Sequence, residues 1–142
     1  MLDAYRDLIE ELTGTPTELR RALDAAPDLR DQAAPLIAAL RDRDQAVHDR
    51  LQAMLRRRDP VLAPLPEGQA AGTVETDAEA ALAGFNPIRG ELVSLLMNLT
   101  LRDWERTAID ESGAETGLAD EVERHVEYDE ETRARILAAL GG

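Results

Sequence analysis

The sequence contains no cysteine and no lysine, and each absence excludes a class of chemistry. Without cysteine the chain has no disulfide, no thiolate nucleophile and no thiolate metal ligand. Without lysine it has no side-chain amine for a Schiff base, and all 16 basic residues are arginine. The two histidines, His48 and His125, are too few for a three-histidine metal site within one chain.

Aromatic residues are also scarce, at 3% of the sequence, so the core has to be built from Leu, Ile, Val and Ala. That composition favours closely packed helices over a β-sandwich. No apolar run approaches the roughly 18 residues that a membrane-spanning helix requires. The first residues are amphipathic and acidic, which is not typical of a signal peptide, so we expect a cytoplasmic protein.

Acidic residues outnumber basic ones by 29 to 16, which gives a formal net charge of -13. Such a chain repels phosphate backbones and anionic membranes, so we expect neither a nucleic-acid nor a membrane partner. The length of 142 residues suits one domain with a full core, and we expect residues 1–142 to form a single domain.

Apolar residues spaced three and four apart predict an all-α protein, a bundle of four amphipathic helices. The predicted ranges are 2–23, with a break or kink at Gly14 and Pro16; 31–57; 77–99, with Pro87 inside; and 118–140. Residues 58–76 are rich in Pro and Gly and predict a long crossover between the second and third helices. Thr76 or Asp77 is the predicted cap of the third helix, and Gly141 and Gly142 are the predicted end of the fourth. Residues 100–104 predict a capped short turn, followed by a loop that holds Gly113 and Gly117.

Two of the predicted helices carry polar residues in the middle of their apolar stripes. In the second helix the interruption is Arg43 and Asp44, and in the fourth it runs from His125 to Thr132. If these helices face each other, the bundle has a polar layer at its centre. Bundle proteins place ligand and metal sites in such layers.

The stretch from Ala83 to Ile136 resembles the DinB-like superfamily of helical-bundle proteins. The matching segments are FNPIRGELVSLLMNLTLRDW (85–104), ERT (105–107) and LADEVERHVEYDEETRARI (118–136), and more loosely TPTELRRAL (15–23) and PLIAALRDRD (35–44). The resemblance implies a four-helix bundle with a long crossover, and a homodimer.

Many members of that family bind a divalent metal through three histidines, and some transfer thiols. Carried over to this sequence, the three ligand positions fall on Ala39, Tyr128 and Thr132. Alanine has no donor atom, the tyrosine is protonated near neutral pH, and threonine is a weak ligand. The resemblance therefore implies a retained scaffold without the family's metal, and we predict no metal, no cofactor and no catalytic residue of the family type.

The leading hypothesis is a metal-free, homodimeric bundle that binds a small ligand or a protein partner. The candidate central pocket, at the former metal site, comprises Ala39, Asp42, His125, Tyr128, Asp129 and Thr132. The alternative is a thiol-dependent transferase or a related enzyme that uses an altered site made from Asp42, His125, Tyr128 and Asp129. A third hypothesis is an acidic protein that captures a basic partner.

Three features have a simpler structural interpretation beside the functional one. His125 is a ligand or general base in one interpretation and a hydrogen-bonded core histidine in the other. The acidic cluster Glu121, Glu123, Glu127, Asp129, Glu130 and Glu131 binds a cation or partner, or is a solvated helix face. Arg56, Arg57 and Arg58 hold an anion, or complement the dipole at a helix C-terminus.

Overall fold

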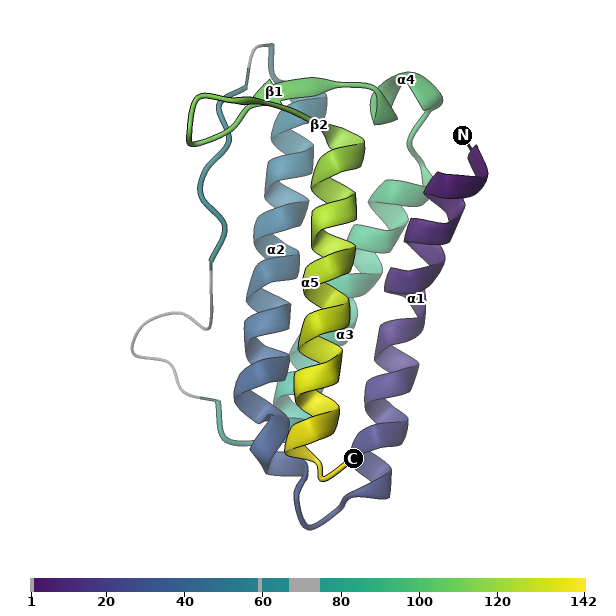
Figure 1. Ribbon diagram of the computed structural model, residues 1–142, viewed down its shortest axis with the longest axis vertical. Helices are drawn as coiled ribbons and strands as arrows, with labels where there is room; N and C mark the ends of the chain where they lie inside the picture. Colours follow the sequence, from purple (N-terminus) through teal and green to yellow (C-terminus); the bar gives the residue numbers. More distant parts are fainter. Residues whose placement is uncertain (1, 59, 67–74) are drawn as a thin grey trace.

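The computed structural model describes residues 2–58, 60–66 and 75–142 and confirms the predicted four-helix bundle (Figure 1). The long helices are α1 (Leu2–Ala25), α2 (Ala34–Arg56), α3 (Ala78–Met97) and α5 (Leu118–Ala139). The shorter elements are the 3-10 turn η1 (Arg30–Ala33), α4 (Leu101–Trp104), and the strands β1 (Thr107–Ile109) and β2 (Glu115–Gly117). No helix among the described residues is long and apolar enough to cross a membrane.

The order of the helices requires the predicted crossover. In Figure 1, α2 and α3 run in the same direction, so the chain returns along the bundle between them. The backbone N–H of Ala78 donates to Asp31 Oδ1 at 3.0 Å, which holds the start of α3 beside the start of α2. Residues 67–74 of this connection lie outside the described residues.

The predicted helix caps are confirmed at the start of α3, at the start of α4 and at the end of α5. Asp77 Oδ1 accepts from the backbone N–H groups of Glu79 at 3.0 Å and Ala80 at 3.4 Å. Thr100 and Asp103 form a capping box at the start of α4. Gly141, with a φ of 84°, supplies the left-handed turn that ends α5.

Of the predicted break or kink at Gly14 and Pro16, the break is wrong, because α1 continues as one helix through both residues. Pro16 has no N–H, so the carbonyl of Leu12 lacks its usual helical donor. Arg89 Nη1 on α3 donates to that carbonyl instead, at 2.9 Å. The proline thus opens an acceptor toward the centre of the bundle, and a side chain from another helix fills it.

The start predicted for the second helix is also displaced. Residues 30–33 form the 3-10 turn η1, and the α-helix begins at Ala34 with a proline, Pro35, in its first turn. Proline suits this position because the first N–H groups of a helix have no intrahelical partner.

The predicted loop around Gly113 and Gly117 is a β-hairpin instead. β1 and β2 pair antiparallel, with Ala108 opposite Thr116. Asp110 Oδ1 accepts from the backbone N–H groups of Ser112 and Ala114, and Gly113 takes a φ of 86°. Three-residue strands are too short to show an alternating pattern, whereas the Asp-x-Ser-Gly turn is a local signal.

The core consists of two apolar clusters, one toward each end of the bundle. The cluster at the hairpin end contains Leu12, Val47, Leu51, Met54, Leu62, Leu92, Leu96, Trp104, Ala108, Leu118, Val122 and Val126. The other contains Leu19, Leu23, Ala33, Ala34, Ile37, Leu40, Ala78, Ala81, Leu82, Phe85, Ile136 and Leu140. On every long helix the two clusters are separated by a short gap in the sequence, and the buried polar residues Thr15, Asp44, Arg89 and Asp129 lie in these gaps.

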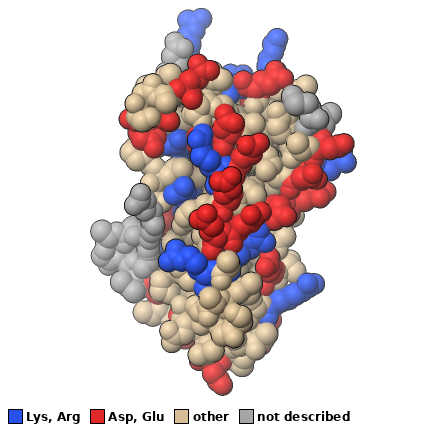
Figure 2. All heavy atoms as spheres, in the orientation of Figure 1, with Lys and Arg blue, Asp and Glu red and all other residues tan. Residues whose placement is uncertain are grey.

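Acidic side chains form a band down the face shown in Figure 2, where α5 lies. The predicted solvated face is confirmed for the exposed residues Glu123, Glu127, Glu130 and Glu131. It is wrong for Glu121 and Asp129, which are buried. Both of these carboxylates are held by arginine, which is how a buried charge is tolerated.

Candidate functional site

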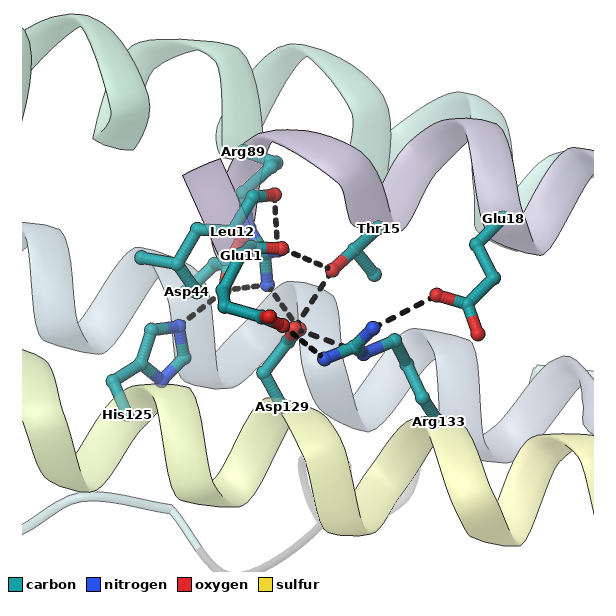
Figure 3. Close-up of polar contacts among 9 residues, drawn as sticks. All are labelled: Glu11, Leu12, Thr15, Glu18, Asp44, Arg89, His125, Asp129 and Arg133. Carbon is teal, nitrogen blue, oxygen red and sulfur yellow. Dashed lines mark hydrogen bonds and ion pairs between the residues drawn. The ribbon is translucent and has the colours of Figure 1, made fainter. Parts of the chain in front are cut away.

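A layer of mostly buried polar side chains from all four long helices lies between the two core clusters (Figure 3). We call it the central network; it comprises Thr15 from α1, Asp44 from α2, Arg89 from α3, and His125, Asp129 and Arg133 from α5. All except Arg133 are buried. The polar layer expected from the interrupted stripes is therefore present.

Arg89 is the centre of this network and is 1% exposed. Its guanidinium makes a two-point contact with Asp44, from Nε to Oδ2 at 2.6 Å and from Nη2 to Oδ1 at 2.9 Å. Nη2 also donates to Asp129 Oδ1 at 2.7 Å, and Nη1 donates to the Leu12 carbonyl. One side chain from α3 thus joins the other three long helices, using the planar fork of donors that arginine provides.

His125 lies on the other side of Asp44, with its Nε2 2.6 Å from Asp44 Oδ1. Burial raises the pKa of Asp44, but the hydrogen bonds from His125 and Arg89 outweigh it, so the pKa lies below its ordinary value. Among the described residues His125 Nδ1 has no hydrogen-bond partner. The simpler interpretation of His125, a hydrogen-bonded core histidine, matches this arrangement.

Asp129 extends the network toward the surface. Its Oδ2 accepts from Thr15 Oγ1 at 2.7 Å and lies 3.2 Å from Arg133 Nε. Arg133 in turn donates to Glu18 at 2.8 Å and to Glu11 at 3.1 Å. The ionic contacts therefore run from the centre of the bundle to the outer face of α1, with charges of alternating sign (Figure 3).

Of the six predicted pocket residues, the structure brings two, His125 and Asp129, into the central network. Tyr128 is half-buried, and its ring lies under the guanidinium of Arg43, 4.3 Å from the ring centroid. Asp42 is half-buried and accepts from Arg41 Nε at 3.1 Å rather than from a residue of the network. Ala39 is half-buried and Thr132 is buried, and the structure gives neither side chain a polar contact.

The three positions that the DinB resemblance implies for a metal do not fit one. Ala39 offers no donor, and the cation of Arg43 covers the face of the Tyr128 ring. Within the described part of the chain, no group of three or more His, Cys, Asp or Glu side chains is arranged to hold a metal ion. We therefore derive no step of chemistry through a metal.

A second buried ionic cluster fastens the hairpin to the bundle. Arg50 on α2 and Glu121 on α5 are each 6% exposed, and Arg50 Nε donates to Glu121 Oε1 at 2.7 Å. Thr116 on β2 donates to Glu121 Oε2 at 2.8 Å, and Arg50 Nη1 lies 3.2 Å from Glu111 in the hairpin turn. We call Arg50, Glu111, Thr116 and Glu121 the hairpin cluster.

The sequence-based candidates omitted Thr15, Arg89 and Arg133, although two of these carried a detectable signal. Thr15 lies three residues after Leu12 and four before Leu19, and Arg89 lies four residues after Phe85 and three before Leu92. That spacing places both on the buried stripe of their helices. A charged residue at such a position predicts a buried partner of opposite charge.

No protein-family model and no curated protein matches this sequence. Among solved structures, it is similar to YfiT from Bacillus subtilis, described as a probable metal-dependent hydrolase with an unusual four-helix bundle topology. The TM-score is 0.77 at 18% sequence identity, over 98% of this chain and 87% of the YfiT chain. At this identity the likeness shows the fold, and the chemistry has to be argued from this chain's own residues.

Proposed function

We propose that this protein is a metal-free bundle that acts as a binding module, with a buried ionic network, rather than a metal, at its centre. The observation that carries the proposal is the position of Arg89. Its guanidinium binds both buried carboxylates of the layer, Asp44 and Asp129, which are the negatively charged groups that a cation there would need.

The charge of Arg89 also opposes a cation at this place. At about 4 Å, a divalent ion and a guanidinium repel each other by roughly 8 kcal/mol at an effective dielectric constant of about 20. A metal would have to displace the guanidinium from Asp44 and Asp129, and would leave it buried without a partner. The network therefore supports a structural role for the layer, with an arginine rather than a metal between its carboxylates.

The alternative is an enzyme with an altered site, and the likeness to YfiT, a probable metal-dependent hydrolase, is the finding that favours it. A catalytic site needs several of its side chains to converge on one cavity. Here His125 and Asp129 are committed to buried partners, Tyr128 packs under Arg43, and Asp42 pairs with Arg41. These contacts favour the binding module over the enzyme.

We further propose that the protein is a homodimer that associates through the outer face of α3. The exposed residues of that helix are small or uncharged, apart from Glu91. Met97, near its end, is 68% exposed. In a chain with a net charge of -13, two copies repel each other least through an uncharged face.

Metal uptake by the wild-type protein and an Arg89→Met variant tests the proposed function. Both are grown with added zinc, nickel and manganese, purified without chelators or tags, dialysed, and analysed for metal content. We expect a small fraction of an equivalent in the wild type. Arg89→Met frees Asp44, Asp129 and His125 as ligands, so the variant should retain zinc if it folds, as judged by circular dichroism.

An Arg135→Met variant is the matched control, because the substitution removes the same charge from an exposed position on α5. It should resemble the wild type. Near one equivalent in the wild type would overturn the proposal. A folded Arg89→Met protein that takes up no metal would overturn the role given to Arg89.

A further inference from the structure

The end of the bundle that carries the hairpin has a hollow of about 420 Å³ between the last turn of α2 and β1. Three arginines line it, Arg57 and Arg58 from the end of α2 and Arg106 from the residue before β1. Apolar atoms of Met54 and Ala108 line it too. We call this hollow the arginine pocket.

Backbone hydrogen bonds hold the walls of the arginine pocket in place. Leu62 N donates to the Ile109 carbonyl at 2.9 Å, and Ile109 N donates to the Pro60 carbonyl at 3.2 Å. These bonds join the chain after α2 to β1. Leu118 N donates to the Arg106 carbonyl at 2.8 Å, which ties the start of β1 to the start of α5. The pocket is therefore built from paired backbone rather than from a free loop.

The arginines of the pocket are largely unpaired, although the chain has a large excess of carboxylates. Arg57 and Arg58 are exposed and make no ion pair or side-chain hydrogen bond with any described residue. Arg106 uses its Nε for Asp103, at 3.2 Å, and its terminal nitrogens have no such partner. Among the described residues that line the pocket, Glu115 is the one carboxylate. Figure 2 shows arginine side chains projecting at this end, above the acidic band.

The dipole of α2 explains only part of this arrangement. A positive charge at a helix C-terminus is favourable, and Arg57 is the C-cap of α2. Arg106, however, belongs to the segment after α4, about 50 residues further along the chain. Two segments that are distant in sequence therefore bring guanidinium groups to one hollow with an apolar wall.

We propose that the arginine pocket binds a small phosphate ester with an apolar body, and this rests on the proposed function as a binding module. A phosphate group carries nearly two negative charges and three acceptor oxygens, which match the planar donor forks of arginine. The apolar body would cover Met54 and Ala108, and its burial adds affinity that a free anion lacks. The pocket lies near the end of α2, whereas the central network lies at Asp44, so the two sites are separate.

Phenyl phosphate is the probe, titrated into the wild-type protein by calorimetry and followed by amide chemical shifts. We expect one saturable site with shifts at the end of α2 and in β1. Inorganic phosphate should bind more weakly because it has no apolar part, and uncharged phenol should not bind. Affinity should fall as salt concentration rises.

The variants are Arg57→Gln, Arg58→Gln and Arg106→Gln, with Arg135→Gln as the matched control. Each of the three should weaken binding by about fivefold to tenfold, because a charge-assisted contact is lost at a partly exposed site. The control should bind like the wild type. A linear titration without saturation, or equal losses in the pocket variants and the control, would overturn this inference.

The metal content of the same preparations separates the two proposals. If the protein contains no metal and does not bind phenyl phosphate, the proposed ligand class is refuted and the metal-free proposal stands. A protein with a full equivalent of metal refutes the proposed function, whatever phenyl phosphate does.

Discussion

Arg89 and Asp44 form a two-point ion pair across the centre of the bundle, with contacts of 2.6 and 2.9 Å and both side chains at most 1% exposed. Such a pair contributes little net stability compared with a well-packed apolar core, because both charges lose their hydration. The hydrogen bonds of these buried groups can form only when α2, α3 and α5 are packed in one relative register. We therefore expect the central network to destabilise misaligned packings of the helices rather than to raise the stability of the native one.

Removal of Arg89 alone should therefore be strongly destabilising. Arg89→Met leaves Asp44 and Asp129 buried without their principal cation, which we expect to lower the free energy of unfolding by about 3 to 5 kcal/mol. Urea denaturation followed by circular dichroism, in chelator-treated buffer, measures the change. Arg135→Met, on the exposed face of α5, should cost less than about 0.5 kcal/mol. Equal effects of the two substitutions would contradict the role of the network.

Acid should weaken the same interaction. The pKa of Asp44 lies below its ordinary value of 3.8, since His125 and Arg89 offset the effect of burial. A group whose folded-state pKa is lowered contributes stability above the unfolded pKa, and loses it as pH falls through the folded value. The free energy of unfolding should therefore drop as the pH falls below about 4.

An Asp44→Asn variant isolates this contribution from that of the other carboxylates, which titrate in both proteins. The variant should be less stable at neutral pH, and the difference from the wild type should shrink on acidification. Urea midpoints measured over a pH series give the comparison. If the urea midpoints of the two proteins differ by the same amount at every pH, Asp44 is not the source of the loss of stability in acid.

The helices and the crossover could be predicted because they depend on local patterns. Apolar spacing located all four long helices, and Asp77 and Gly141 marked ends that the structure confirms. The hairpin was missed because its strands have three residues each, and its attachment depends on Arg50, far away in the sequence. Short strands of this kind are specified by tertiary contacts more than by periodicity.

The central network was predicted only in outline. The interrupted stripes of α2 and α5 indicated the layer, since Asp44 and His125 both broke an apolar pattern. In α3 the charged Arg89 occupies the buried position, whereas its apolar neighbour Ile88 is half-buried. Because an apolar residue is expected on the buried stripe of a helix, the spacing of Arg89 alone did not identify it as buried. The partners of Arg89 lie 45 and 40 residues away, so no local window contains the reason for its burial.

Glu121 should control how firmly the hairpin is held. Glu121→Gln removes the charge that faces buried Arg50 and weakens the contact with Thr116, which we expect to cost about 2 to 3 kcal/mol. Amide hydrogen exchange should accelerate first in β1 and β2, because the side chains of the hairpin cluster attach them to α2 and α5. Glu123→Gln, exposed on the same helix, is the control. Uniform acceleration over the whole bundle would contradict a local role.

The proposed homodimer predicts that a charge in the middle of the α3 face dissociates it. Gly90 is exposed, and a Cβ at this position would meet no atom within 4 Å, so Gly90→Glu fits the folded protomer. In a dimer through α3 it would place like charges from two copies close together, or bury them, and weaken association at least tenfold.

Gly14→Glu is a matched control, because Gly14 is also exposed and open, on α1. Light scattering coupled to size exclusion should show a dimer for the wild type and Gly14→Glu, and a monomer for Gly90→Glu. A monomeric wild type at micromolar concentration would refute the dimer, and a dimeric Gly90→Glu protein would place the interface away from α3.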